Sequence, residues 1–128
     1  MKLGAIAFTL AAVSLAPAYP AGVAQQKYPD VLDARVHMRH DNRFDFDVTI
    51  ASPYDTPLRY ADAFRVMSME GSVFGERTLF HHHANEQPFT RDLYGVAIPS
   101  GINTVIIQAR DSKYGYGGTT LHVTLPGR

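Results

Sequence analysis

The strongest constraint on the fold is a strict alternation of apolar and polar residues along one stretch of the chain. In residues 44–50 every even position is Phe, Val or Ile, and every odd position is Asp or Thr. Successive side chains of a β-strand point to opposite faces of the sheet, whereas a helix beginning at Phe44 would place Asp47 on its apolar face. The segment is therefore predicted to be a half-buried strand.

A second alternating segment precedes this one and predicts a β-hairpin. Residues 32–39 alternate in the same way, so Leu32, Met38 and the even positions between them are expected to face the core. Residues 40–42, with the sequence His-Asp-Asn, separate the two segments. Asn tolerates the left-handed conformation that a three-residue hairpin loop requires, so a tight antiparallel connection is expected.

Two registers of this hairpin would bring opposite charges together on its polar face. One register places His37 opposite Asp45 and Arg35 opposite Asp47, and the other pairs Arg39 with Asp45. Each such cross-strand pair contributes about 0.2–1 kcal/mol. The charges in this part of the chain therefore have a structural explanation.

The remaining sequence predicts five more short strands separated by Pro, Gly, Asn and Ser. The segment 59–69 is apolar on both parities and predicts a central strand, with Met67 and Met69 in the core. The last two strands flank a glycine-rich hairpin loop at 111–118. The expected strands cover residues 59–69, 77–82, 89–98, 105–109 and 121–125.

This pattern predicts an all-β protein. About seven short strands within roughly 100 residues are typical of an antiparallel β-sandwich of the immunoglobulin or fibronectin type III kind. A small β-barrel is the alternative.

The first residues predict an exported protein. Met1-Lys2 is positively charged, and the apolar run that follows to Leu15 is shorter than the roughly 20 residues needed to cross a bilayer. Small residues before Gln25 favour signal cleavage after Ala24, with cleavage after Ala18 as the alternative. We therefore expect a signal peptide over 1–24 and one periplasmic or secreted domain over 25–128. That domain would begin with a short lead at 25–30 and contain no transmembrane segment.

Composition excludes several classes of function. Twelve Lys and Arg balance twelve Asp and Glu, so the basic surface of a nucleic-acid binder is not expected. The chain has no cysteine, which excludes disulfides, thiol nucleophiles and cysteine-based zinc sites. Motifs such as Gly-x-Ser-x-Gly, His-Glu-x-x-His and a glycine-rich phosphate loop do not occur. The sequence therefore favours a non-catalytic module without a cofactor.

The histidine-rich segment 81–86 is a candidate metal site. On a strand, His81 and His83 would point to the same face with their side chains about 6.5–7 Å apart. Imidazole nitrogens suit copper and zinc, and Glu86 could supply a third ligand. The alternative is a polar strand edge whose histidines bond locally or lie in water.

The glycine-rich loop is a candidate interaction site. Tyr114 and Tyr116 would offer amphipathic contact area at a loop end of the sandwich, where binding residues commonly lie. Alternatively, the glycines serve the hairpin geometry and the tyrosines cover the open end of the core. Nearby, Arg91 is expected to pair with Glu86 or Asp111. The sequence thus favours contact with an unknown protein or ligand through Tyr114 and Tyr116, with copper or zinc binding as the alternative function.

Three stretches resemble an uncharacterised family of small secreted bacterial proteins. They read GERTLFHHHANEQPFTRDL, VAIPSG and ARDSKYGYGG, and they contain the pattern His-x-His-x-x-Glu-Gln-Pro-Phe-Thr-Arg. The resemblance covers roughly residues 60–126 and carries no activity with it. The hairpin VIIQARDSKYGYGGTTLHVTLP is also similar to the last two strands of bacterial immunoglobulin-like modules, which implies the fold alone.

Overall fold

The computed structural model describes Gly4 and residues 26–128, so the predicted signal peptide, apart from Gly4, lies outside the described residues. The described chain forms seven strands and contains no helix long and apolar enough to cross a membrane. In chain order the strands are β1 (Asp30–Met38), β2 (Arg43–Ala51), β3 (Ala61–Met67), β4 (Val73–Thr78), β5 (Phe89–Ala97), β6 (Thr104–Asp111) and β7 (Gly115–Thr124).

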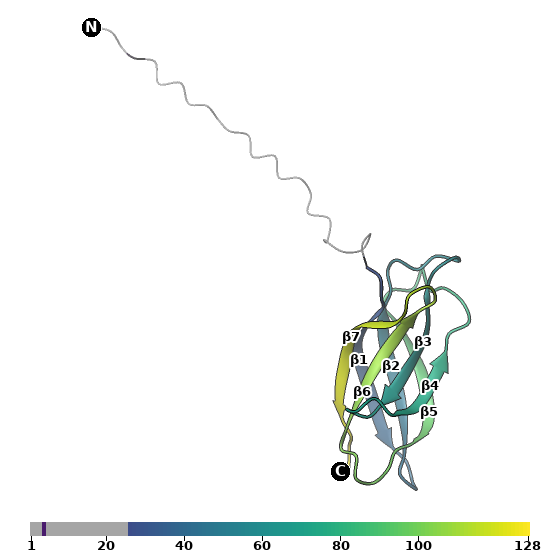
Figure 1. Ribbon diagram of the computed structural model, residues 1–128, viewed down its shortest axis with the longest axis vertical. Coiled ribbons are helices and arrows are strands. Elements are labelled where there is room, and N and C mark those ends of the chain that lie inside the picture. Colours follow the sequence, from purple (N-terminus) through teal and green to yellow (C-terminus); the bar gives the residue numbers. More distant parts are fainter. Residues whose placement is uncertain (1–3, 5–25) are drawn as a thin grey trace.

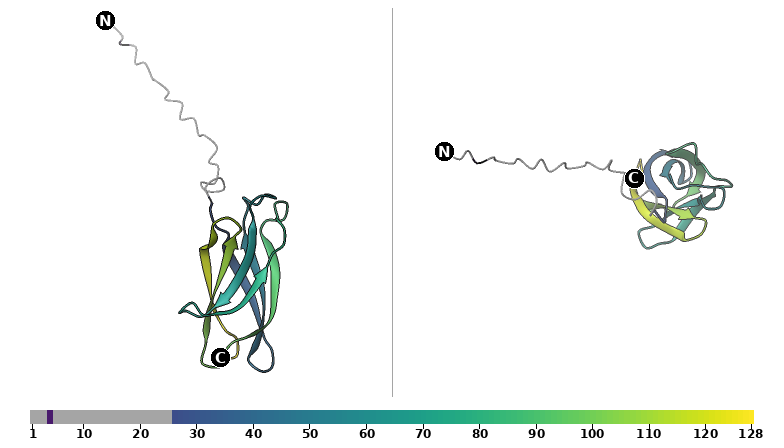
Figure 2. Two further views of the ribbon diagram at one scale, coloured as in Figure 1. Left: turned by 45° about the vertical axis from the view of Figure 1, so that its right-hand side comes forward. Right: turned by 90° about the horizontal axis from the view of Figure 1, so that it is seen from above.

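The strands form two antiparallel sheets packed face to face (Figures 1 and 2), which confirms the predicted sandwich. The first sheet has the order β1-β2-β5 and the second has the order β4-β3-β6-β7. In constant-type immunoglobulin domains the fourth strand joins the sheet of the first, second and fifth strands. Because β4 pairs with β3 instead, the arrangement is that of a fibronectin type III domain.

The core lies between the two sheets and consists of the inward-facing parity of each strand. All four apolar residues that carry the alternation in β2 are fully buried, as predicted. They pack against inward residues of β3 and β6, whose burial is favoured by about 25 cal/mol per Å² of apolar surface removed from water. The core residues from these three strands are Phe44, Phe46, Val48, Ile50, Ala61, Phe64, Val66, Val105, Ile107 and Ala109.

The predicted hairpin is confirmed, with a correction at its first strand. His37 lies opposite Asp45 and Arg35 opposite Asp47. The side chain of Arg39 also reaches Asp45 diagonally, with 3.4 Å between Nη1 and Oδ1. Asp41 and Asn42 of the connecting loop have φ values of 61° and 59°, in the left-handed region that the loop was expected to require.

Three apolar residues expected in the core lie outside it. A β-bulge between Val31 and Asp33 changes the parity of β1, so Val31 is buried and Leu32 faces solvent. Met38 ends β1 beyond the covered part of the sheet, and Met69 lies in the turn after β3 ends. The core assignment is therefore wrong for Leu32, Met38 and Met69, whereas Met67 is buried as predicted.

Two predicted strand boundaries are also wrong. The fourth strand covers Val73–Thr78 rather than 77–82, so the histidine-rich segment follows the strand instead of forming it. The last strand begins at Gly115 rather than near residue 121, which places Tyr116 in a strand. The loop of the last hairpin is thus reduced to residues 112–114, and the ladder extends through the glycines.

Gly118 is required by the close approach of the first residues of the domain to β7. Its φ is +77°, and a Cβ atom there would lie 2.3 Å from the carbonyl oxygen of Pro29. A side chain at this position would therefore displace the backbone of the lead as well as strain its own. The glycine-rich sequence of this hairpin has a structural role along β7.

We expect Gly118→Ala to lower the free energy of unfolding by about 1–3 kcal/mol, because it adds a strained φ and a backbone clash. Gly101→Ala is the matched control, since a Cβ atom at Gly101 has no heavy atom within 4 Å. Urea unfolding followed by circular dichroism measures both variants. Equal midpoints for the two variants would contradict the assigned role of Gly118.

Candidate interaction surface

One end of the sandwich gathers the segments that connect the two sheets. The lead at 26–29 and the loops 52–60, 79–88 and 112–114 lie together there, at the top of Figure 1, and we refer to them as the loop end. The turns after β1, β3 and β5 lie at the opposite end with the C-terminus. Loops on a rigid sandwich are the usual place for recognition residues.

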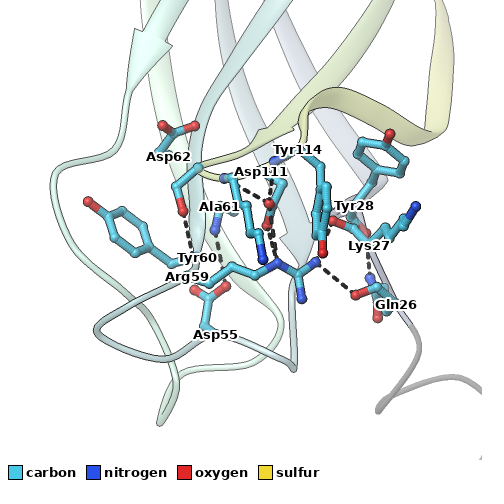
Figure 3. A network of polar contacts seen from close by, with 12 residues as sticks. Gln26, Lys27, Tyr28, Asp55, Arg59, Tyr60, Ala61, Asp62, Asp111 and Tyr114 are labelled. Carbon is cyan, nitrogen blue, oxygen red and sulfur yellow. Dashed lines mark hydrogen bonds and ion pairs between the residues drawn. The ribbon is translucent and has the colours of Figure 1, made fainter.

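Arg59 links the second loop-end segment to the lead and to the last loop (Figure 3). Its guanidinium lies between two aromatic rings, 4.1 Å from the ring centre of Tyr54 and 4.9 Å from that of Tyr114. The Nε atom is 3.1 Å from a carboxylate oxygen of Asp111, and Nη2 donates to both backbone carbonyls of residues 26–27. One side chain therefore joins three segments that are distant in sequence.

Asp111 is the fully buried partner of this arginine. Its Oδ2 atom also accepts hydrogen bonds from the backbone N–H groups of Lys113 and Tyr114, each at 2.9 Å. Burial alone would raise the pKa of Asp111, but the hydrogen bonds from Tyr114, Lys113 and Arg59 outweigh it and lower the pKa. Burial, followed by the Asp111 carboxylate, raises the pKa of the Tyr54 hydroxyl. Asp111 is therefore charged in the folded protein.

Asp55 connects its own loop, 52–60, to the loop 79–88. One carboxylate oxygen accepts the backbone N–H of Ala61 at 3.1 Å, and the other accepts the backbone N–H of His83 at 3.0 Å. The side chain of Gln87 adds a second connection, because its Oε1 atom accepts the backbone N–H of Ser52 at 2.7 Å. Asp55, Arg59 and Asp111 thus fasten the loop end together, and we refer to them as the loop brace.

Two apolar side chains on the loops joined by the loop brace are exposed to solvent. Leu58 lies at the tip of a tight turn, where the backbone groups of Thr56 and Arg59 exchange hydrogen bonds, and it is 94% exposed. Phe80 follows the buried Leu79 and is 81% exposed. Leu58 and Phe80 are the most exposed of the large apolar side chains in the described residues, and both belong to the loop end.

The structure separates the two tyrosines that the sequence had placed in one loop. Tyr114 belongs to the loop end, where it contacts the ring of Tyr28 edge-on at 6.4 Å and is 42% exposed. Tyr116 lies instead on the outer face of the second sheet, where its hydroxyl bonds to Glu76 and Arg65 stacks on its ring at 3.8 Å. The loop end therefore includes Tyr114 but not Tyr116.

The histidines do not have the geometry that strand spacing implied, because they follow β4. His83 is buried and stacks on Phe89 at 4.0 Å, and the ring of His81 lies 5.0 Å from that of His83. Neither ring nitrogen of His83 has a hydrogen-bond partner. Burial, followed by the nearby charge of Arg91, lowers the pKa of His83, which favours the neutral ring.

Glu86 is engaged with Arg91, one of the two pairings expected for that arginine. Its two carboxylate oxygens accept from Nη1 and Nη2 at 3.2 and 3.1 Å, a bidentate ion pair. The hydrogen bond from Arg91 is the main cause of the lowered pKa of Glu86. Within residues 26–128, no three His, Asp or Glu side chains are grouped closely enough to hold a metal ion.

Two open hollows of about 270 and 340 Å³ lie on the polar face of the first sheet. Arg35 and Asp47 line both of them, and the Tyr94 hydroxyl donates to Asp47 at 3.0 Å. The lining includes the facing pairs of Arg35 with Asp47 and of His37 with Asp45 across β1 and β2. Strand pairing explains these side chains, so the loop end remains the better candidate surface.

Sequence reasoning found Tyr114 at the loop end and missed Leu58, Phe80 and the loop brace. A Pro57-Leu58 pair in a turn-rich segment is a signal for an exposed tip, since Pro favours the first central position of a β-turn. Nothing in the sequence indicated that Asp55, Arg59 and Asp111 would meet. Their association depends on how the two sheets place their loops.

The comparisons with known proteins are few. No family model matches the chain. A protein of Halomicrobium mukohataei named "Putative lipoprotein" is 31% identical over 94 residues, which are 73% of this chain and 46% of that protein. The chain therefore spans about half the length of this relative. A solved DUF3823 family protein from Bacteroides ovatus has 16% identity and a TM-score of 0.42, covering 77% of this chain and 56% of that one.

We expect Asp111→Asn to lower the free energy of unfolding by about 3 kcal/mol or more, since it leaves Arg59 without its buried counter-charge. Because the pKa of Asp111 is lowered by folding, its contribution is complete above its ordinary value of 3.8 and is lost as the pH falls through the folded value. As the pH is lowered through this range, the free energy of unfolding of Asp111→Asn should therefore decrease less than that of the wild-type protein.

The matched control is Asp62→Asn, which removes a carboxylate that is 22% exposed and 3.7 Å from Arg110. Burial raises the pKa of Asp62, so its charge contributes little and the change should cost about 1 kcal/mol or less. Urea midpoints measured over a series of acidic pH values test both changes. If Asp111→Asn lowers the free energy of unfolding no more than Asp62→Asn does, the loop brace contributes little to stability.

Proposed function

We propose that this protein is an exported, non-catalytic binding module of the cell envelope that contacts its partner through the loop end. The signal-like first residues support export, and the name of the Halomicrobium relative supports a place in the envelope. The sequence contains none of the catalytic motifs sought above, which supports a non-catalytic role. Fold alone does not assign an activity, so the proposal depends on the surface.

The observation that carries the proposal is the exposure of Leu58 and Phe80 on fastened loops. Burying one such side chain against a partner is worth about 1.5–3 kcal/mol. A surface held in one conformation before binding also loses less entropy when the partner arrives. The loop brace therefore favours contact through these two side chains, and the half-exposed Tyr114 lies at the same end of the sandwich.

The proposal predicts that the double variant Leu58→Ser with Phe80→Ser loses about tenfold or more of its affinity for cell envelopes. Purified protein is incubated with envelope fragments of the source organism, and the bound fraction is measured after sedimentation. Met69→Ser with Val73→Ser is the control, because these residues are also half-exposed but lie at the opposite end. Unchanged retention of the loop-end variant would refute the proposal.

A second candidate function is copper or zinc binding by His81 and His83. It is favoured by the two unpartnered ring nitrogens of His83 and by the neighbouring ring of His81, 5.0 Å away. A neutral imidazole is the form that binds these metals, and a lowered pKa of His83 maintains it. Glu86 could complete the site only after leaving Arg91, with which it forms two hydrogen bonds.

Metal binding predicts one site in a calorimetric titration of tag-free protein with Zn²⁺ or Cu²⁺. His81→Ala should abolish the site without disturbing the core, since His81 is exposed, and His122→Ala should leave it unchanged. Arg91→Met should tighten binding if Glu86 is the third ligand, because it releases the carboxylate. A titration without heat, or one indifferent to His81→Ala, would eliminate this function.

A further inference from the structure

We infer that the loop end binds an anionic lipid surface; this inference rests on the proposed function and specifies its partner. The first observation is the form of the apolar contact. Leu58 and Phe80 stand on two separate loops, 52–60 and 79–88, each projecting its own side chain. A protein partner would need a matching pocket for each projection, whereas the fluid interior of a bilayer accepts both without one.

The second observation is the distribution of lysine. The chain has three lysines, and the two within the described residues, Lys27 and Lys113, both lie at the loop end. Their Nζ atoms are 5.1 and 5.2 Å from the ring centre of Tyr114. Two cations beside a half-exposed tyrosine match the headgroup region of a bilayer, where tyrosine rings and lysine amines are favoured.

The third observation is that three nearby acidic side chains make their contacts within the protein. Asp55 and Asp111 are buried and accept hydrogen bonds within the loop brace. Glu86 forms its ion pair with Arg91. Because Asp111 is paired with Arg59 and Glu86 with Arg91, the amines of Lys27 and Lys113 can meet negatively charged headgroups.

The segments that carry the exposed apolar side chains and the lysines lie at one end of the domain. The loops 52–60, 79–88 and 112–114 and the lead all lie at the same end of the long axis of the sandwich (Figures 1 and 2). Lys27 belongs to the lead and Lys113 to the loop 112–114. A domain seated through this end would stand upright on the membrane, with Leu58 and Phe80 entering the acyl boundary. Lys27 and Lys113 would lie at the level of the lipid phosphates. The opposite end, with the C-terminus, would remain free.

Vesicle flotation tests the inference. The wild-type protein is expected to float with vesicles of phosphatidylcholine and phosphatidylglycerol at low salt, and about tenfold less with phosphatidylcholine alone. Lys27→Gln with Lys113→Gln should remove this preference for the anionic vesicles. Leu58→Ser with Phe80→Ser should abolish flotation with both, while Met69→Ser with Val73→Ser floats like the wild type. Urea midpoints equal to that of the wild-type protein show that each variant is folded.

Insertion is measured directly with Phe80→Trp. The chain contains no tryptophan, so this variant has a single indole reporter at the loop tip. A blue shift of its emission on adding anionic vesicles, and none with Val73→Trp at the opposite end, is the expected result. No flotation of the wild-type protein at low salt, or flotation insensitive to both double variants, would overturn the inference.

Protease-treated envelopes separate this inference from the proposed function. Retention on envelopes that survives proteolysis and depends on Leu58 and Phe80 supports a lipid partner. Retention lost on proteolysis, with no binding to vesicles, means a protein partner, which overturns the lipid inference and leaves the proposed function standing. Absence of binding to both envelopes and vesicles refutes the two together.

Discussion

The ion pair between Arg59 and the buried Asp111 is the interaction on which the loop end depends. A charged carboxylate is costly to bury, and it is tolerated because a guanidinium and two backbone N–H groups satisfy it. The same guanidinium then positions the lead and lies between Tyr54 and Tyr114. This ion pair therefore holds the lead, the loop 52–60 and the loop 112–114 in place relative to one another.

The loop brace also explains how a domain without cysteine maintains ordered loops. Small exported domains often use disulfides for this purpose. In this protein Asp55 joins the loops 52–60 and 79–88 through backbone hydrogen bonds, while Arg59 and Asp111 join the remaining segments. These buried hydrogen bonds and the ion pair between Arg59 and Asp111 restrict the loops where a disulfide would otherwise do so. The apolar surface left exposed on these loops is therefore a fixed feature of the fold.

The two sheets have a different role, because most of their side chains are explained by pairing and packing. The polar face of the first sheet consists largely of opposite charges facing each other between β1 and β2. On the second sheet, Tyr116 is covered by Arg65 and bonded to Glu76. On these two faces, the charged and aromatic side chains described above contact one another within the protein. The loop end differs from them in degree, because Leu58 and Phe80 are 94% and 81% exposed whereas Leu32 of β1 is 51% exposed.

Local alternation decided the fold class, since each strand of a sandwich must present one apolar face to the core whatever its neighbours are. It also decided the pairing of β1 with β2, because a short loop and opposite charges leave few registers. It failed at Leu32, where a bulge changed the parity, and at Met38, where the sheet no longer covered the strand. It failed again where Tyr116 continued a strand through glycines.

The sequence by itself therefore determined an alternating, two-layered β-protein with turns in nearly the right places. Only the tertiary structure decided which loops meet, and hence that Asp55, Arg59 and Asp111 would form one network. It also decided that Tyr114 and Tyr116 would lie on different surfaces. The physical reason is that alternation is a property of neighbouring residues, whereas the loop end is assembled from segments that only the packing of two sheets brings together.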